Sequence, residues 1–169
     1  SAIVLSALEY DELTGLYIRQ AFFHHAKTLM RVKKDQKFHV VVADVKNFKW
    51  INSTYGEKTG DQVLAYLGEA YKSQVHSGMV ARYGGDQFVA IVYGDLNFGK
   101  DKVEAAIRKI AEQAPISNLS VNYGIYENVD KTLPLTLICD RAFLAMKSIQ
   151  NDYEHSFAFY DEEMGRKHI

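Results

Sequence analysis

The pattern of apolar and polar positions predicts alternating helices and strands along the whole chain. Residues 17–33 carry apolar side chains at helical spacing, and residues 38–44 form an apolar run that ends in a carboxylate, as in a buried strand. Helical spacing returns over 47–55, 60–77, 100–113 and 135–149, whereas short strand-like runs cover 79–83, 86–93, 119–126 and 156–160. The predicted order α-β-α-α-β-β-α-β-α-β indicates an α/β (α+β) domain with a mixed sheet of about five strands.

Gly84 and Gly85 separate two of these strands. A Gly-Gly pair predicts a two-residue hairpin, because both central positions favour a positive φ angle. A carboxylate, Asp86, follows the pair and is expected to begin the next strand, and a carboxamide, Gln87, comes directly after it. Taken alone, this segment is equally typical of an ordinary hairpin.

The bulk properties restrict the class of protein. A chain of 169 residues with 47% hydrophobic content fits one domain with its own core. The net charge of −1 gives no basic field, so no nucleic-acid partner is expected. The single Cys139 suits a reducing compartment, and no apolar run approaches the roughly 20 residues of a membrane span. We expect a cytoplasmic module, in a full-length protein that is free or membrane-attached.

Two carboxylates lie at predicted strand ends. Asp44 ends one strand and Asp86 begins another, and strand ends are places where side chains can converge on a ligand. Two converging carboxylates repel each other unless a cation joins them or one of them takes up a proton, and oxygen ligands without His or Cys favour Mg²⁺ or Mn²⁺. The other interpretation is that both residues are strand-end caps.

A second set of polar residues surrounds the predicted start of the helix over 60–77. Asn52 and Asp61 offer a carboxamide and a carboxylate, which suit the N1–H and N2–H₂ donors of a guanine edge, although many other ligands would fit. Alternatively, Asp61 is a first-turn carboxylate that interacts favourably with the helix dipole.

Several blocks of the chain, taken in order, resemble the GGDEF domain, the diguanylate cyclase family of bacterial cyclic-di-GMP signalling. The family motifs are D-x-L-T-G-L-x-N-R, D-x-D-x-F-K, N-D-x-x-G-H-x-x-G-D, R-x-G-G-D-E-F, S-x-G-I and A-L-Y-x-A-K. Their counterparts here are Asp11–Arg19, Asp44–Lys49, Asn52–Asp61, Arg82–Phe88, Val121–Ile125 and Ala142–Lys147. The resemblance implies a nucleotide-cyclase-like palm domain over residues 11–160.

The resemblance also implies roles for individual residues. Asp44, Asp86 and the backbone carbonyl of Val45 would hold Mg²⁺ or Mn²⁺, and Asn52 and Asp61 would bind guanine. The remaining substrate-binding positions are Phe48, Lys49, Gly84, Gly85 and Lys147. In active members two GTP-loaded domains face each other as a homodimer, and each 3′-hydroxyl attacks the other GTP to give cyclic-di-GMP and pyrophosphate.

Several positions depart from the family pattern. Gln87 stands where active members have the signature Glu, and a carboxamide cannot accept a proton at neutral pH. Lys46 replaces the second Asp of D-x-D, where an inward-pointing cation would weaken metal binding. Asn151 replaces an arginine of the phosphate site, and residues 75–78 lack the R-x-x-D motif of the family's product site.

These departures affect catalysis more than guanine binding. We expect a GTP-binding regulatory module with little or no cyclase activity, and whether the chain is an enzyme is left open. The alternatives are a slow diguanylate cyclase and a structural or dimerising module that binds no nucleotide. Residues 1–10 are expected to be a remnant or the end of a connector helix, and 161–169 to begin a linker to a further domain. Degenerate members of the family often accompany an EAL phosphodiesterase or a sensor domain in the same chain.

Overall fold

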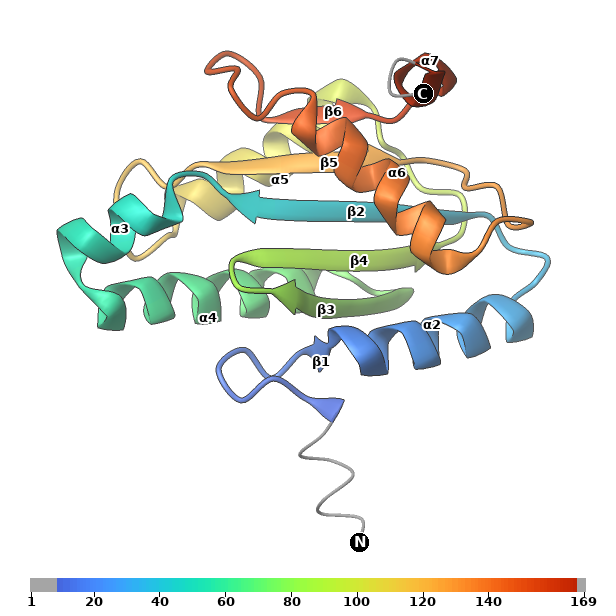
Figure 1. Ribbon diagram of the computed structural model, residues 1–169, viewed down its shortest axis with the longest axis horizontal. Helices are drawn as coiled ribbons and strands as arrows, with labels where there is room; N and C mark the ends of the chain where they lie inside the picture. The colour runs from blue at the N-terminus through green and yellow to red at the C-terminus, as the bar shows by residue number, and fades with distance from the viewer. Residues whose placement is uncertain (1–8, 167–169) are drawn as a thin grey trace, which may run out of the picture.

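The protein is represented by a computed structural model that describes residues 9–166. It contains a six-stranded sheet with the strand order β1-β3-β4-β2-β5-β6 (Figure 1). The pairs β1–β3 and β5–β6 are parallel and the inner pairs are antiparallel, so the predicted mixed sheet is confirmed. The strands are β1 (Tyr17–Ile18), β2 (Phe38–Val45), β3 (Gly78–Gly84), β4 (Gln87–Tyr93), β5 (Val121–Tyr126) and β6 (Phe157–Phe159).

Helices cover both faces of the sheet (Figure 1). On one face, α2 (Arg19–Val32) and α6 (Leu135–Lys147) share a core with alternate residues of β2, such as Val40 and Val42. On the other face, α4 (Glu57–Gln74) and α5 (Lys100–Glu112) pack over Ala43 and Val45. The short α3 (Phe48–Tyr55) joins β2 to α4, and α7 (Glu162–Arg166) follows β6.

The centre of the sheet follows directly from the sequence pattern. β2 is apolar at almost every position because both of its faces are covered by helices, which is the reason for its continuous apolar run. The exceptions are His39, which is buried near the start of the strand, and Asp44, which lies one residue before its end. The central strand therefore presents one carboxylate, close to its C-terminal end.

The predicted count of five strands was one too low. Tyr17 and Ile18 were assigned to the first helix, but they pair with Ala81 and Arg82 of β3, and the helix begins at Arg19. A two-residue strand has no periodicity of its own, and its pairing with β3 depends on the tertiary fold. The start of α4 was also misplaced: it begins at Glu57, so Asp61 lies in the second turn and not in the first.

The hairpin turn lies one residue later than predicted. Gly84 pairs with Gln87, so the two turn residues are Gly85 and Asp86. Of these, Gly85 has a φ of 45° and Asp86 does not have a positive φ. The register shifts between Arg82 and Gly84, and such a β-bulge lengthens β3 by one residue. Asp86 therefore lies in the turn itself and does not begin β4.

The flanking segments are described only in part. Residues 1–8 of the predicted segment 1–10, and residues 167–169 of the segment 161–169, lie outside the described residues. Within the second segment, α7 is joined to α6 by an ion pair between Arg141 and Glu162, with an N···O distance of 3.6 Å. No helix within residues 9–166 combines the length and apolar content needed to cross a membrane. The predicted domain limits stay a prediction.

Candidate nucleotide and cation site

A row of polar side chains crosses the sheet at the end that carries the hairpin. Asp44 on β2 is the register partner of Gln87 on β4 and of Asn122 on β5. Register partners on neighbouring strands point to the same face, so the three side chains lie side by side. Asp86 lies in the adjoining turn, where its backbone carbonyl accepts a hydrogen bond from the Val45 N–H at 3.2 Å. Asp44 and Asp86 are therefore brought together, while their roles stay a prediction.

The two carboxylates affect each other's ionisation. The pKa of Asp44 is raised to about 7; burial is the largest cause, and Asp86 adds to it through hydrogen bonding and like charge. A hydrogen bond with the Gln87 side chain acts in the opposite direction and lowers this pKa in part. One proton shared by the two carboxylates, or a cation bound between them, would relieve their repulsion.

The chemistry of these residues fits a small divalent cation. Carboxylate oxygens are preferred ligands of Mg²⁺ and Mn²⁺, which commonly bind through one or two carboxylates together with substrate phosphates. Among residues 9–166, no cluster of three or more His, Cys, Asp or Glu side chains is placed to hold a metal ion. A cation at Asp44 and Asp86 would therefore need further oxygens from the backbone, water or a bound phosphate, and the predicted carbonyl of Val45 directly follows Asp44.

The Lys46 ammonium does not lie between these carboxylates. Its Nζ donates a hydrogen bond to the backbone carbonyl of Asp152 at 3.2 Å and lies 4.8 Å from the centre of the Tyr153 ring. Lys46 therefore holds the segment that follows α6 against the end of β2. The inward orientation that would weaken cation binding is not the one observed.

The predicted guanine-binding residues lie at the junction of α3 and α4. Asn52 packs against Gly60 so closely that a Cβ atom at Gly60 would overlap the Asn52 side chain. The Phe48 ring also packs against Gly60. Asp61 follows Gly60 and is exposed on α4. Glycine at position 60 thus lets the two helices approach until Asn52 and Asp61 lie at neighbouring positions. Lys49 is exposed on α3.

The position of Lys147 follows from the packing of α6. Gly124 of β5 lies directly beneath this helix, because a Cβ atom there would be 2.8 Å from the Met146 backbone nitrogen and would overlap the Ala142 carbonyl. Lys147 is the last residue of α6 and is exposed. Since Gly124 is two residues from Asn122, the last turn of α6 comes to the end of the sheet that carries Asp44.

Two features of this region had no predicted role. Asn122 is only 2% exposed, and its Oδ1 has no hydrogen-bond partner among the described residues. A polar residue inside the apolar run of β5 was the available signal. The second feature is the Arg82 side chain, which connects the opening block of the chain to the hairpin.

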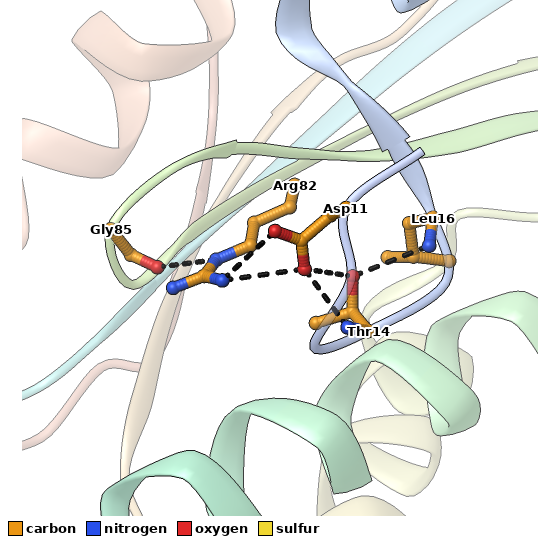
Figure 2. A network of polar contacts seen from close by, with 5 residues as sticks. All are labelled: Asp11, Thr14, Leu16, Arg82 and Gly85. Carbon is orange, nitrogen blue, oxygen red and sulfur yellow. Dashed lines mark hydrogen bonds and ion pairs between the residues drawn. The ribbon is translucent and has the colours of Figure 1, made fainter. Parts of the chain in front are cut away.

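Figure 2 shows the contacts of Arg82. Its Nη1 lies 3.1 Å from Asp11 Oδ1, and its Nε donates a hydrogen bond to the Gly85 carbonyl at 2.8 Å. The Thr14 backbone N–H and hydroxyl both donate to Asp11 Oδ2 (Figure 2). The network fixes the turn that contains Asp86 to the loop before β1. Two motifs that are 71 positions apart in sequence thus form one structural unit.

Comparison with known proteins decides the family. The sequence profile of the family described as "Diguanylate cyclase, GGDEF domain" matches residues 8–153. The chain belongs to the GGDEF domain family. This GGDEF domain is 30% identical over 141 residues to the diguanylate cyclase DgcS of Shewanella oneidensis, an alignment that covers 73% of the chain and 48% of DgcS. It is 27% identical over 131 residues to the diguanylate cyclase VdcA of Vibrio cholerae, covering 72% of the chain and 38% of VdcA.

The chain thus spans less than half the length of these two relatives. Among solved structures, the coiled-coil and GGDEF domain of DgcB from Caulobacter crescentus, in complex with c-di-GMP, superposes with a TM-score of 0.76 at 21% identity, covering 94% of this chain and 88% of that one. This likeness shows the fold. The predicted palm-like architecture of the GGDEF domain is therefore confirmed, whereas the roles of its site residues stay predictions.

Proposed function

We propose that this GGDEF domain is a regulatory module of cyclic-di-GMP signalling that binds GTP with Mg²⁺ and has little or no cyclase activity. The observation that carries the proposal is the row Gln87–Asp44–Asn122. In this row the carboxylate suited to a cation is retained, whereas the position next to it holds a carboxamide. The site thus keeps groups for binding, and the position that holds a glutamate in active members has no proton acceptor.

The carboxamide at position 87 has a direct chemical consequence. Activation of a ribose hydroxyl needs an acceptor for its proton, and a neutral carboxamide cannot supply one. Losing a general base costs on the order of 10²–10⁴ in rate. Gln87 faces Asp44 across the β2–β4 ladder and offsets part of the rise in the Asp44 pKa, but it cannot itself take up a proton.

GTP is proposed to contact both the junction of α3 and α4 and the carboxylates beside the hairpin. Asn52 and Asp61 would bind the guanine base through its N1–H and N2–H₂ donors, with Phe48 packed beside Asn52. A divalent cation, when bound, would neutralise phosphate charge at Asp44 and Asp86. Lys49 near the start of α3 and Lys147 at the end of α6 are both exposed and would add positive charge for the triphosphate. Gly84 and Gly85 leave the hairpin side open because no Cβ atom projects from them.

The regulated partner is proposed to be a domain outside these residues, such as an EAL phosphodiesterase or a sensor. One structurally similar protein is the S helix-GGDEF-EAL fragment of Vibrio cholerae LapD bound to c-di-GMP, which has a TM-score of 0.69 at 15% identity. In the present chain, α7 is attached to α6 through Arg141, whose guanidinium also lies 5.0 Å from the centre of the Tyr160 ring. The same helix carries Lys147, which is proposed to contact the triphosphate. Nucleotide binding would therefore be transmitted to the C-terminal segment through α6.

A slow diguanylate cyclase is the second candidate. It is favoured by the retained Asp44 and Asp86 pair, because a bound cation with water as proton acceptor would support residual turnover. In that case two domains must meet face to face, so product formation would rise more steeply than linearly with protein concentration. The third possibility, a purely structural module, requires that neither GTP nor Mg²⁺ binds.

Calorimetric titration of the chain with GTP in millimolar Mg²⁺ tests the binding part of the proposal. We expect GTP to bind, and Asp61→Ala to weaken binding by about tenfold or more because two guanine donors lose their acceptor. Gln62→Ala is the matched control, since Gln62 is the exposed neighbour of Asp61 on the same helix, and it should leave the affinity unchanged. No binding at millimolar GTP, or equal effects of the two substitutions, would remove the proposal.

A further inference from the structure

A cavity lies on the face of the sheet opposite to Asp44. Its volume is about 360 Å³, and it opens between the sheet and α5. Ala43 of β2 and Phe88 of β4 line it, and these residues are the sequence neighbours of Asp44 and Gln87. Successive side chains along a strand point to opposite faces, so this cavity and the candidate GTP site lie on opposite sides of the same two strands.

The cavity exists because α5 packs loosely on the sheet. Val103, Ala106, Ile107 and Ile110 form an apolar stripe at helical spacing, but only Ile110 of this helix is buried. The other three line the cavity and are half-buried. Protein interiors are close-packed and contain few voids larger than a water molecule, whereas small-molecule pockets begin at about 300 Å³. A lined space of this size therefore has the character of a binding pocket.

The polar groups around the cavity point to one kind of ligand. Among the described residues that line it, Lys102 is the only one with a formal charge. Lys102 is exposed in the first turn of α5, where the helix dipole and free backbone N–H groups also favour an anion. Asp101 lies in the same turn but does not line the cavity. At the inner wall, the Tyr71 and Tyr123 hydroxyls are hydrogen-bonded to each other at 2.8 Å, so they do not require a polar ligand group.

We propose that this cavity binds a small amphipathic carboxylate of the medium-chain fatty acid class. The alkyl chain lies between α5 and the sheet, against Ala43, Phe88 and Ala106, and the carboxylate lies at Lys102 and the N-terminus of α5. This site goes beyond the proposed GTP-binding function and does not depend on it, because it shares no lining side chain with the row that contains Asp44.

Calorimetric titration of the whole chain with sodium decanoate, and with the neutral decan-1-ol for comparison, tests the proposal without nucleotide. Decanoate should bind more tightly than the alcohol. Lys102→Glu should weaken decanoate binding by roughly tenfold or more and leave decanol binding unchanged, because only the charged ligand uses the ammonium group. Arg108→Glu is the matched control: Arg108 is exposed on the same helix and does not line the cavity, so both ligands should bind as before.

Ala106→Phe is designed to fill the cavity and should weaken both ligands by at least about tenfold. Circular dichroism and thermal melting establish whether this variant is folded, and if it is not, the Lys102→Glu and Arg108→Glu pair decides the question. The proposal is overturned if decanoate does not bind at millimolar concentration, if Lys102→Glu has no greater effect than Arg108→Glu, or if folded Ala106→Phe binds both ligands normally. None of these results bears on whether GTP binds at the opposite face.

Discussion

Gln87 lies directly across the β2–β4 ladder from Asp44, whose pKa is raised to about 7 by burial and by the neighbouring Asp86 and is lowered in part by Gln87. A glutamate at this position would add a third negative charge beside Asp44 and Asp86. The carboxamide removes that charge and keeps nearly the same shape. Gln87 in place of glutamate therefore separates turnover from cation binding. It removes a proton acceptor and leaves the pair of carboxylates suited to a cation.

Asp44→Asn should stabilise the protein at neutral pH in the absence of divalent cations. Folding raises the pKa of Asp44 from 3.8 to about 7, so its contribution to stability is fully present below pH 3.8 and is lost as pH rises through 7. Because Asp44 is only partly buried, we expect the gain above pH 7 to be about 1–2 kcal/mol after allowance for solvent screening. Urea unfolding across this pH range measures it, and a pH-independent difference between variant and wild type would contradict the assignment.

The same pair of proteins tests the cation site. Millimolar Mg²⁺ should raise the unfolding temperature of the wild type, because a ligand that binds only the folded state stabilises it. The Asp44→Asn variant should show little or no such shift, since one of the two carboxylates proposed to bind the cation is gone. An equal rise of the unfolding temperature in both proteins would mean that Mg²⁺ binds at another site.

The ion pair between Arg82 and Asp11 should contribute measurably to stability. Both side chains are mostly buried, at 21% and 19% exposed, and the Asp11 carboxylate also accepts hydrogen bonds from Thr14. Burial opposes the ionisation of Asp11, but these hydrogen bonds and the Arg82 charge hold its pKa below the usual value. In a double-mutant cycle with Arg82→Ala and Asp11→Ala, we expect a coupling energy of about 1–3 kcal/mol.

The exposed pair of Lys37 and Asp95 provides the control for this cycle. Its N···O distance is 3.4 Å, but the side chains are 65% and 91% exposed, so its coupling energy should be at most about 0.5 kcal/mol. Chemical unfolding of the two sets of variants gives both values. Equal coupling in the two cycles would mean that the Arg82 network does not hold the hairpin to the opening loop.

Two glycines of the site region should differ sharply in their tolerance of a methyl group. Gly124→Ala places a Cβ atom against the backbone of α6 and should cost about 2–4 kcal/mol of unfolding free energy. Gly84→Ala should change stability by less than about 1 kcal/mol, because Gly84 has no positive φ and no heavy atom lies within 4 Å of its added Cβ among the described residues. Urea denaturation compares them, and similar losses would contradict the close approach of α6 to β5.

The sequence predicts much of this fold because the apolar pattern is strongest in the elements that form the core. The run over β2 is apolar on both faces, and α2, α5 and α6 have apolar stripes, so these elements were placed to within a few residues. The beginning of α4 was missed because its first residues, Glu57–Gly60, are polar or glycine and carry no apolar stripe. β1 was missed because two residues are too few for any periodicity, and its pairing with β3 is a long-range contact.

The candidate site, like the fold, could be predicted from the sequence only in part. Asp44 and Asp86 are found from their places at the ends of apolar runs, but the position of the turn depends on a bulge that pattern alone does not predict. The orientation of Lys46 depends on Asp152, which is 106 positions away in sequence. The burial of Asn122 depends on how α6 lies over β5. Residue identity predicts which groups are present, and tertiary contacts decide which of them face one another.

The most direct test measures GTP binding and product formation on one preparation of the wild type and of Gln87→Glu. We predict that both bind GTP with Mg²⁺, that the wild type forms little or no cyclic-di-GMP, and that Gln87→Glu raises the rate by about 10²–10⁴ where residual turnover is measurable. Cyclic-di-GMP formation by the wild type at the rate of Gln87→Glu would contradict the separation of binding from turnover. Failure of the wild type to bind GTP at millimolar concentration would contradict the regulatory function itself.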